Sequence, residues 1–187
     1  MLKTLPDYLK SGLDLVLIGI NPGLYSVERG HYFARKTSRF WPAFSRSRLS
    51  EPMRRALKVE ILLPEHDSEL LRFGIGLTDV VKRPTANASE LTPQDFASGI
   101  PLLLQKLRGY KPRVACFHGL TAYRAFHKVA FGSRADLSLG EQHERIDVTG
   151  LYVVPNPSPA NAHFTPADQA AWYDRLAEFL LKTPILC

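Results

Sequence analysis

The sequence predicts an α/β fold, a three-layer α/β/α sandwich around a central, mostly parallel sheet. Short apolar runs typical of strands alternate with amphipathic, helical segments along the whole chain. Several of these runs end abruptly in polar loops, as buried parallel strands do at the carboxyl edge of a sheet. The 187 residues suffice for one well-buried domain and are few for two, so we expect a single domain over residues 1–187.

The first half of the chain contains two strand-like runs separated by helical segments. In order, they are a strand over 14–20, a loop over 21–37, a helix from Ser38 through Phe44, a basic helix over 52–63 and an apolar run over 73–81. Ser38 is a favourable N-cap residue, and Pro42 falls within the first turn, where proline is tolerated. Phe40 and Trp41 are expected to be core residues on this helix.

The second half continues the alternation and ends in a long helix. In order, we expect a helix from Thr92 to Leu107, a strand over 113–117, a helix to about Val129, paired strands over 144–148 and 151–155, and a helix from Thr165 to about Leu180. Thr92-Pro93 followed by Asp95 is a strong helix start, because proline suits the first turn and an acid favours the positive end of the helix dipole. The paired strands are expected to turn at Thr149-Gly150.

Asn21 is the first polar residue after an unbroken apolar strand. The loops after Ile20, Phe117 and Pro155 should lie near one edge of the sheet, where open α/β sheets bind ligands. An amide there can orient a water molecule or a carbonyl group. The alternative is that Asn21 only hydrogen-bonds its own turn, as Asn-Pro sequences often do.

Composition excludes several classes of protein. No apolar run has transmembrane length, and we read no signal peptide in the first 20 residues. Two cysteines make neither a disulfide framework nor a CxxC motif, so we expect a cytosolic protein. There is no Walker A or GxGxxG motif, and the six histidines are scattered, so we expect no cofactor and no metal.

The positive charge is concentrated in one segment. Residues 29–58 hold nine of the lysines and arginines against a single acid, Glu51, a local charge of +8 in a chain of net charge +6. This pattern is typical of a polyanion-binding surface. The alternative is an ordinary solvated helix face.

Three segments together resemble a known family. They are GINPGLYSVERGHYFARKTSRFW over 19–41, GLTDVVKRPT over 76–85 with ASEL over 88–91, and PNPSPAN over 155–161. The chain resembles, from about residue 13 to 182, the mismatch-specific uracil-DNA glycosylase and thymine-DNA glycosylase family of the uracil-DNA glycosylase superfamily. The resemblance implies a repair enzyme that flips uracil or a related damaged or mismatched base out of DNA and hydrolyses its N-glycosidic bond. It implies DNA as partner, no membrane, and a monomer associated with the bacterial nucleoid.

The resemblance also implies roles for individual residues. Asn21 would position the attacking water, Phe33 would stack on the flipped base, and the backbone around Ile20 and Phe33 would pair with the pyrimidine edge. The expected base contacts are Ile20, Phe33 and Ser26, and the expected DNA contacts are Gly23, Asn156, Pro157, Ser158, Ala160 and Asn161.

Asp79 is predicted to be a second catalytic residue. An amide is too weak a base to activate water, whereas a carboxylate both stabilises an oxocarbenium-like sugar and accepts the proton of water. Asp79 ends an apolar run within the family-like central segment. The alternative is that Asp79 caps a turn or pairs with Lys82 or Arg83.

The chain departs from the family after its NPS motif. Residues 159–162 read PANA and offer no large side chain to fill the stack that a flipped base vacates. Another residue then supplies the wedge, or the substrate is already unpaired, or activity is weak. No lysine in the motifs is an evident Schiff-base nucleophile, which predicts a monofunctional enzyme. The competing hypotheses are a DNA-binding protein with lost or altered catalysis, and a small-nucleotide hydrolase or binding protein.

Overall fold

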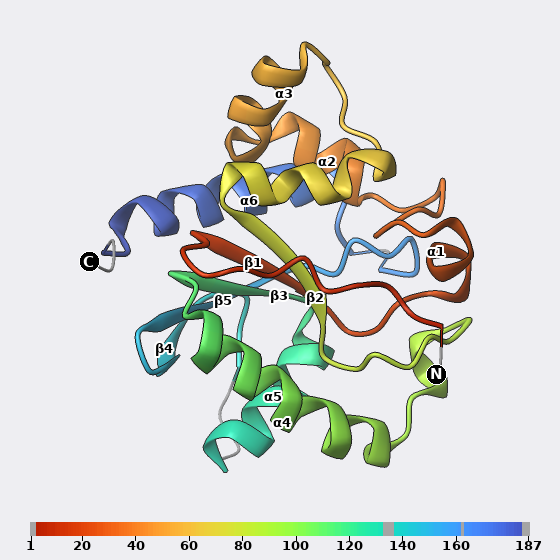
Figure 1. Cartoon of the computed structure of the whole chain (residues 1–187), viewed down its shortest axis with the longest axis vertical. Helices are drawn as coiled ribbons and strands as arrows, with labels where there is room; N and C mark the ends of the chain where they lie inside the picture. The colour runs from red at the N-terminus through yellow and green to blue at the C-terminus, as the bar shows by residue number, and fades with distance from the viewer. Residues whose placement is uncertain (1–2, 133–136, 162, 185–187) are drawn as a thin grey trace.

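The computed structural model describes residues 3–132, 137–161 and 163–184, and its centre is a five-stranded sheet (Figure 1). The strand order is β2-β1-β3-β5-β4. The strands are β1 (Leu15–Gly19), β2 (Ile75–Asp79), β3 (Val114–His118), β4 (Gly140–Ile146) and β5 (Thr149–Val154). Among the five described strands only β4 pairs antiparallel, with β5, so the prediction of a mostly parallel sheet is confirmed.

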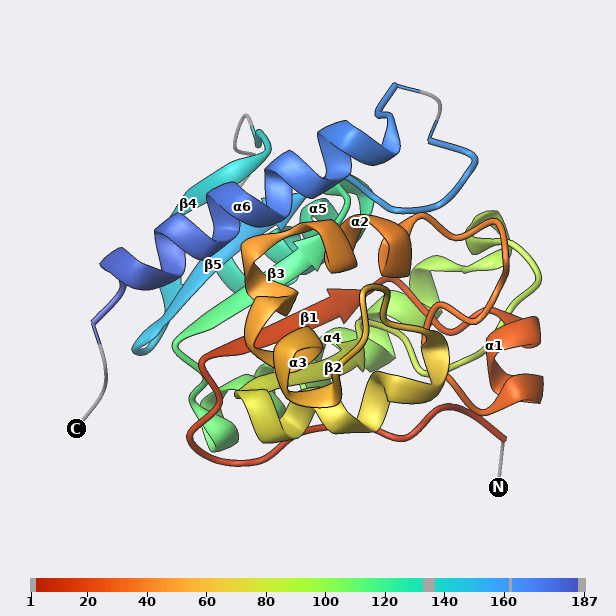
Figure 2. The ribbon, with the colours of Figure 1, turned by 90° about the horizontal axis from the view of Figure 1, so that it is seen from above.

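Helices cover both faces of the sheet, as the sandwich prediction requires (Figures 1 and 2). One face carries α2 (Phe40–Arg46), α3 (Glu51–Leu57), a 3₁₀ segment over Pro64–Phe73 and α6 (Pro166–Lys182). The other carries α4 (Pro93–Tyr110) and α5 (Leu120–Phe131). The short α1 (Leu24–Arg29) begins three residues after Asn21.

The central strand β1 shows why two helical layers are needed. Leu15 and Leu17 pack into the core on the α2–α6 side, whereas Val16 and Ile18 pack into the core on the α4–α5 side. Each of the four side chains is at most 1% exposed, so the strand is buried on both faces. This explains an uninterrupted apolar run where a half-exposed strand would alternate with polar residues. The aromatic residues of α2, Phe40 and Trp41, are buried core residues, as predicted.

Three local expectations were wrong. The loop over 21–37 contains the helix α1. The predicted basic helix over 52–63 ends at Leu57, because Lys58 adopts a left-handed conformation with a φ of 55° and its backbone N–H donates to the carbonyl oxygens of Arg54 and Arg55. The β4–β5 hairpin turns at Asp147-Val148 rather than at Thr149-Gly150, because Asp147 adopts a positive φ of 52° that aspartate tolerates better than most residues.

Within the described residues no helix is long and apolar enough to cross a membrane. The same part of the chain holds no group of three or more His, Cys, Asp or Glu side chains arranged to bind a metal ion.

Candidate active site

The loops that follow β1, β2, β3 and β5 surround one cavity of about 790 Å³ at the carboxyl edge of the sheet. Every residue predicted to contact substrate lines this cavity. They are Ile20, Asn21, Gly23, Ser26, Phe33, Asp79, Asn156, Pro157, Ser158, Ala160 and Asn161. The structure therefore brings together residues up to 141 positions apart in sequence, from Ile20 to Asn161. A cavity of this size accommodates a nucleotide-sized ligand.

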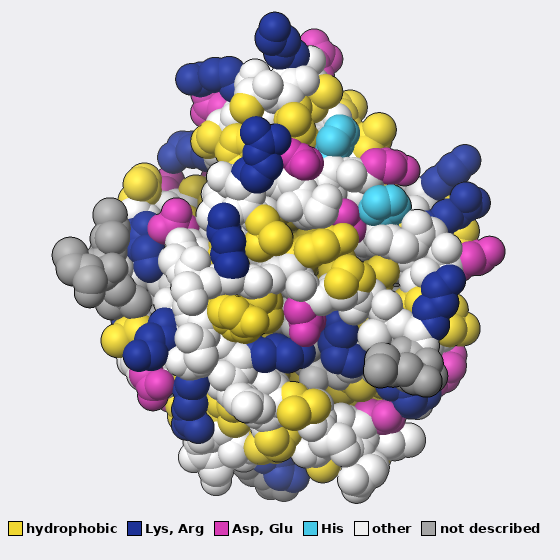
Figure 3. All heavy atoms as spheres, in the orientation of Figure 1, with side chains coloured by type: hydrophobic (Ala, Val, Ile, Leu, Met, Phe, Trp, Pro, Cys, Tyr) yellow, Lys and Arg dark blue, Asp and Glu magenta, His cyan; other side chains and the backbone are white. Residues whose placement is uncertain are grey.

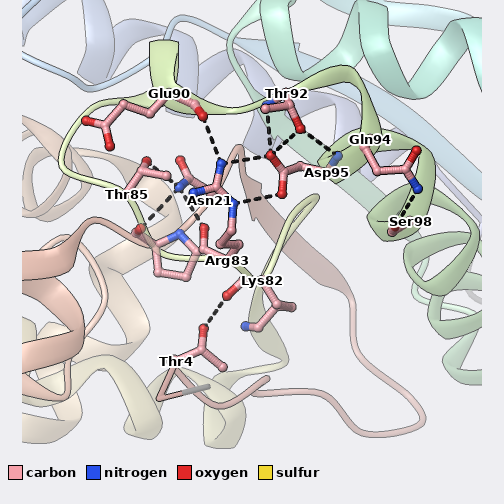
Figure 4. Close-up of polar contacts among 11 residues, drawn as sticks. Thr4, Asn21, Lys82, Arg83, Thr85, Glu90, Thr92, Gln94, Asp95 and Ser98 are labelled. Carbon is pink, nitrogen blue, oxygen red and sulfur yellow. Dashed lines mark hydrogen bonds and ion pairs between the residues drawn. The ribbon is translucent and has the colours of Figure 1, made fainter. Parts of the chain in front are cut away.

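The amide of Asn21 is held in a single orientation. Its Nδ2 donates to the carbonyl oxygen of Arg83 at 3.0 Å, to Thr85 Oγ1 at 2.7 Å and to the Pro22 carbonyl at 3.3 Å (Figure 4). A carbonyl oxygen can only accept, so the NH₂ group must face this side. Oδ1 receives no hydrogen bond from the described residues and lies on the opposite side of the amide. The contact within its own turn is the longest of the three, so a purely local role does not explain the geometry.

Arg83 and Thr85 were not among the predicted site residues. The chain at Thr85 runs beside the Asn21 loop: Leu24 N–H donates to the Thr85 carbonyl at 3.0 Å, and Thr85 N–H donates to the Pro22 carbonyl at 3.2 Å. These bonds join the loop after β1 to the loop after β2. The signal for both residues was their place in the motif GLTDVVKRPT, directly after the strand that carries Asp79.

Asp79 lies at the end of β2, directly opposite Gly19 in the parallel register. A Cβ atom placed on Gly19 would lie 2.5 Å from Asp79 Oδ1, so a side chain there would displace the carboxyl group. Because Gly19 has no side chain, the carboxyl group of Asp79 has room to lie at the cavity. Asn21 is two residues further along the same chain.

Burial dominates the electrostatics of Asp79. The residue is 4% exposed, and Oδ2 has no hydrogen-bond partner among the described residues. Burial raises the pKa of Asp79 to about 6, with the opposing attraction of Lys82 and the repulsion of Asp7 as smaller causes. Lys82 Nζ lies 3.6 Å from Oδ2, so the alternative pairing with Lys82 exists, whereas Arg83 pairs with Asp95 instead.

Lys82 also pairs with a second acid, Asp7, and this pairing weakens its attraction for the carboxyl group of Asp79. Its Nζ donates to Asp7 Oδ1 at 3.0 Å and to the Tyr32 hydroxyl at 3.3 Å. Lys106 lies 2.6 Å from the other carboxylate oxygen of Asp7. Burial favours the neutral form of Asp7, but Lys82, Lys106 and a hydrogen bond from Thr78 together hold its pKa below its usual value. Asp7 is therefore the charged partner of Lys82.

Phe33 forms an aromatic wall of the cavity. Its ring stacks on Phe40 with centroids 4.1 Å apart, and Phe40 stacks on Phe44 at 5.3 Å. Phe33 has a positive φ of 54°, an uncommon conformation for an aromatic residue. The buried Ser26 Oγ accepts the backbone N–H of Ala34 at 3.2 Å and so holds the chain beside Phe33.

His118 also lines the cavity, although it was not among the predicted site residues. It is the last residue of β3, so its position after a buried strand was an available signal. The ring packs edge-on against Phe33 with centroids 5.4 Å apart, and Nε2 lies 3.0 Å from the Tyr173 hydroxyl. Burial lowers the pKa of His118 to about 3, so the imidazole is neutral at physiological pH.

The loop after β5 also lines the cavity. Asn156 Oδ1 accepts the backbone N–H of Ser158 at 2.9 Å, and Asn161 Nδ2 donates to the Asn156 carbonyl at 3.1 Å. Arg39 secures this loop from outside, donating its backbone N–H to Pro157 and its guanidinium to the carbonyl oxygens of Asn161 and Phe164. Pro159 and Ala160 are exposed at its tip, and Ala162 lies outside the described residues.

The basic segment over 29–58 does not act as one patch. Arg35 lines the cavity, whereas Arg48 pairs with Glu178, Arg55 pairs with Glu51, and Arg39 binds backbone carbonyls. On the face shown in Figure 3, lysines and arginines are scattered over the surface and interspersed with acids. The concentration of charge along the sequence is therefore only partly a concentration in space.

Comparisons with known proteins agree with this architecture. Residues 6–179 match the family model of the uracil DNA glycosylase superfamily. The solution NMR structure of a candidate uracil DNA glycosylase from Methanosarcina acetivorans has a similar fold, with a TM-score of 0.60 and 19% sequence identity over 97% of this chain and 99% of that chain. The family match spans all four cavity-forming loops. The chain belongs to the uracil DNA glycosylase superfamily.

Proposed function

We propose that this protein is a monofunctional DNA glycosylase of the mismatch-specific uracil and thymine type, acting as a single domain over residues 1–187. It hydrolyses the N-glycosidic bond of uracil, or of a related damaged or mismatched base flipped out of DNA, and leaves an abasic site. DNA is its partner, and the monomer is the active form.

The observation that carries the proposal is the meeting of three groups in one cavity. The oriented amide of Asn21, the buried carboxyl group of Asp79 and the aromatic ring of Phe33 all line it. Each suits a different requirement of base excision: a positioned water molecule, a charge near the sugar and a surface for the flipped base.

Phe33 compensates for the cost of base flipping. A base in a duplex hides its glycosidic bond, so the enzyme must extrude it and lose its stacking. Stacking on an aromatic side chain returns about 1–3 kcal/mol per base. Phe40 supports the rear face of Phe33 at 4.1 Å, which keeps the ring from tilting away from the base. Ile20 and Ser26 line the same cavity and are the other proposed base contacts.

Hydrolysis divides its tasks between Asn21 and Asp79. As the bond from C1′ to the base nitrogen breaks, the base leaves with the bonding electron pair and the sugar becomes oxocarbenium-like. Asn21 Oδ1 accepts a hydrogen bond from water and directs its oxygen towards C1′. The Asp79 carboxylate stabilises the cationic sugar and accepts the proton that water loses.

Lys82, which lies beside Asp79, supports hydrolysis rather than covalent catalysis. Lys82 Nζ is engaged by Asp7 and Tyr32, and Lys82 is not among the residues that line the cavity. A Schiff-base nucleophile would need to reach C1′ of the flipped nucleotide. Gly23, Asn156, Pro157, Ser158, Ala160 and Asn161 are the proposed contacts to the surrounding DNA.

A glycosylase assay tests the proposal. Duplexes and single strands carrying uracil, thymine opposite guanine, hypoxanthine, xanthine or an etheno base are incubated with the protein, and abasic sites are read as alkali-sensitive strand breaks. We expect release of uracil. Salt-dependent duplex binding without breaks would instead support a DNA-binding protein with lost catalysis. Hydrolysis of free nucleotides in place of DNA bases would support the third hypothesis.

A further inference from the structure

Arg83 connects the Asn21 amide to a distant helix. Its carbonyl oxygen accepts Asn21 Nδ2 at 3.0 Å. Its guanidinium forms a fork with Asp95, with Nε donating to Oδ1 at 2.7 Å and Nη2 donating to Oδ2 at 2.8 Å. Nη2 also donates to the Glu90 carbonyl at 2.8 Å. Figure 4 shows the contacts that join Arg83 to Asn21, Asp95 and Glu90.

Asp95 is itself held in place at the start of α4. Its Oδ2 accepts the backbone N–H of Thr92 at 2.7 Å and the Thr92 hydroxyl at 2.8 Å. Hydrogen bonds from Arg83 first, and then from Thr92, hold the pKa of Asp95 well below its usual value. The carboxylate therefore stays charged throughout the physiological pH range and keeps both oxygens as acceptors.

α4 is a firm support because it packs tightly on the sheet. Ile100, Leu103 and Leu107 are buried against the strands. A side-chain carbon at Gly99 would collide with the carbonyl oxygen of Val80, so the helix backbone touches the chain just beyond β2. The position of Asp95 relative to β2 is thus set by the core.

The segment between Asp79 and α4 needs such a support. Apart from the short 3₁₀ turn over Ala88–Glu90 and the single bridge between Thr85 and Gly23, it has no regular secondary structure, yet it supplies two of the three acceptors that orient Asn21. Displacing a catalytic group by about 1 Å can cost about 100-fold in rate. The two parallel hydrogen bonds of a bidentate arginine–carboxylate pair fix the relative orientation of the two groups as well as their distance.

We propose that the Arg83–Asp95 fork is a positioning device that sets the orientation of Asn21 for catalysis. Arg83 and Asp95 touch neither the base nor the sugar. They act through the Arg83 carbonyl and the Thr85 hydroxyl on the amide. The inference rests on the proposed glycosylase function and adds two positioning residues to that site.

The chain offers a matched control for the test. Asp168 occupies the same position in a second Thr-Pro-x-Asp helix start, accepting the Thr165 backbone N–H at 2.8 Å and the Thr165 hydroxyl at 2.7 Å. No arginine fork to Asp168 is found among the described residues. Asp95→Asn and Asp168→Asn therefore weaken equivalent helix caps, but only Asp95→Asn also weakens a fork.

The experiment measures single-turnover uracil excision and duplex affinity for wild type, Asp95→Asn, Arg83→Lys and Asp168→Asn, with thermal melting to verify folding. We expect Asp95→Asn and Arg83→Lys to lower the excision rate about 10-fold or more with duplex affinity unchanged. Asp168→Asn should excise at the wild-type rate. Combining Asp95→Asn with Asn21→Ala should add nothing to the loss caused by Asn21→Ala, because the fork acts through that amide.

Each alternative result has a definite meaning. Full excision rates for Asp95→Asn and Arg83→Lys overturn the positioning role, as does an equal loss in Asp168→Asn. The positioning role is also overturned if Asp95→Asn lowers the excision rate further in a protein that already carries Asn21→Ala. A wild-type protein that produces no abasic sites overturns the proposed function and, with it, the inference.

Discussion

Phe33 stacks on Phe40 with ring centroids 4.1 Å apart and planes inclined by 18°, so the cavity wall is continuous with the buried core. Phe40 in turn stacks on Phe44, both fully buried. One face of the Phe33 ring is thereby occupied by protein, and the residue also lines the cavity. The core thus supplies a rigid rear support for an aromatic surface of the size of a base.

Replacing Phe33 with leucine should weaken base excision. The loss of stacking is worth about 1–3 kcal/mol, which corresponds to a fall of roughly 5- to 150-fold in kcat/KM. Phe33→Tyr keeps the ring and serves as the control, with a much smaller loss. Steady-state excision from a uracil duplex measures both. Equal activity of the leucine and tyrosine variants contradicts the stacking role.

Asp79 should give the reaction a pH dependence. Its pKa of about 6 means that the carboxylate forms as pH rises through that value, so excision should increase between about pH 5 and 7. Asp79→Asn should lower the rate by about 100- to 10,000-fold, as expected for loss of a general base, and flatten that rise. Single-turnover rates across the pH range measure both effects. A variant with an unchanged profile excludes Asp79 from the mechanism.

The same acid should destabilise the fold at neutral pH. Its pKa is raised on folding, from 3.8 to about 6, so the folded chain binds this proton more tightly than the unfolded chain. That stabilisation is present in full below pH 3.8 and is lost as pH rises through about 6. The melting temperature of Asp79→Asn relative to wild type should therefore increase from pH 4 to pH 8. A constant difference contradicts the burial argument.

Gly19→Ala should damage the site through Asp79. The new Cβ would lie 2.5 Å from Asp79 Oδ1, which forces the carboxyl group or β2 to move. We expect lower stability and little excision. Adding Asp79→Ser to Gly19→Ala should recover much of the lost melting temperature, because the smaller side chain removes the collision. If the losses of melting temperature caused by the two single changes add up in the double variant, the proposed collision between the new Cβ and Asp79 is wrong.

Ala160→Leu should improve action on paired bases. Ala160 is exposed at the tip of the loop after β5 and is too small to replace an extruded base. A leucine there should raise the ratio of uracil excision from a U:A pair to excision from a single strand. Ala167→Leu, at an exposed position in the first turn of α6, is the control and should leave the ratio unchanged. An unchanged ratio for Ala160→Leu places the wedge elsewhere.

The strand ends were predictable because burial leaves a strong pattern. Leu15 to Gly19 is apolar without interruption since helices cover both faces, and the polar residues that follow mark the carboxyl edge. Asn21 and Asp79 could be selected in this way, and both line the cavity. The end of α3 could not be predicted. Helix propensity does not indicate a stop at Lys58, whose left-handed conformation ends the helix, and Leu62 then bonds to Ser45 in the core.

The sequence by itself determined the sandwich, the edge at which the loops meet and the residue types available for chemistry. These follow from hydrophobic periodicity and from motifs read along the chain. Only the tertiary structure decided the orientation of the Asn21 amide, the elevated pKa of Asp79 and the division of the basic segment into separate contacts. Each depends on groups distant in sequence, such as Arg83 beside Asn21, since hydrogen bonding and desolvation act through space.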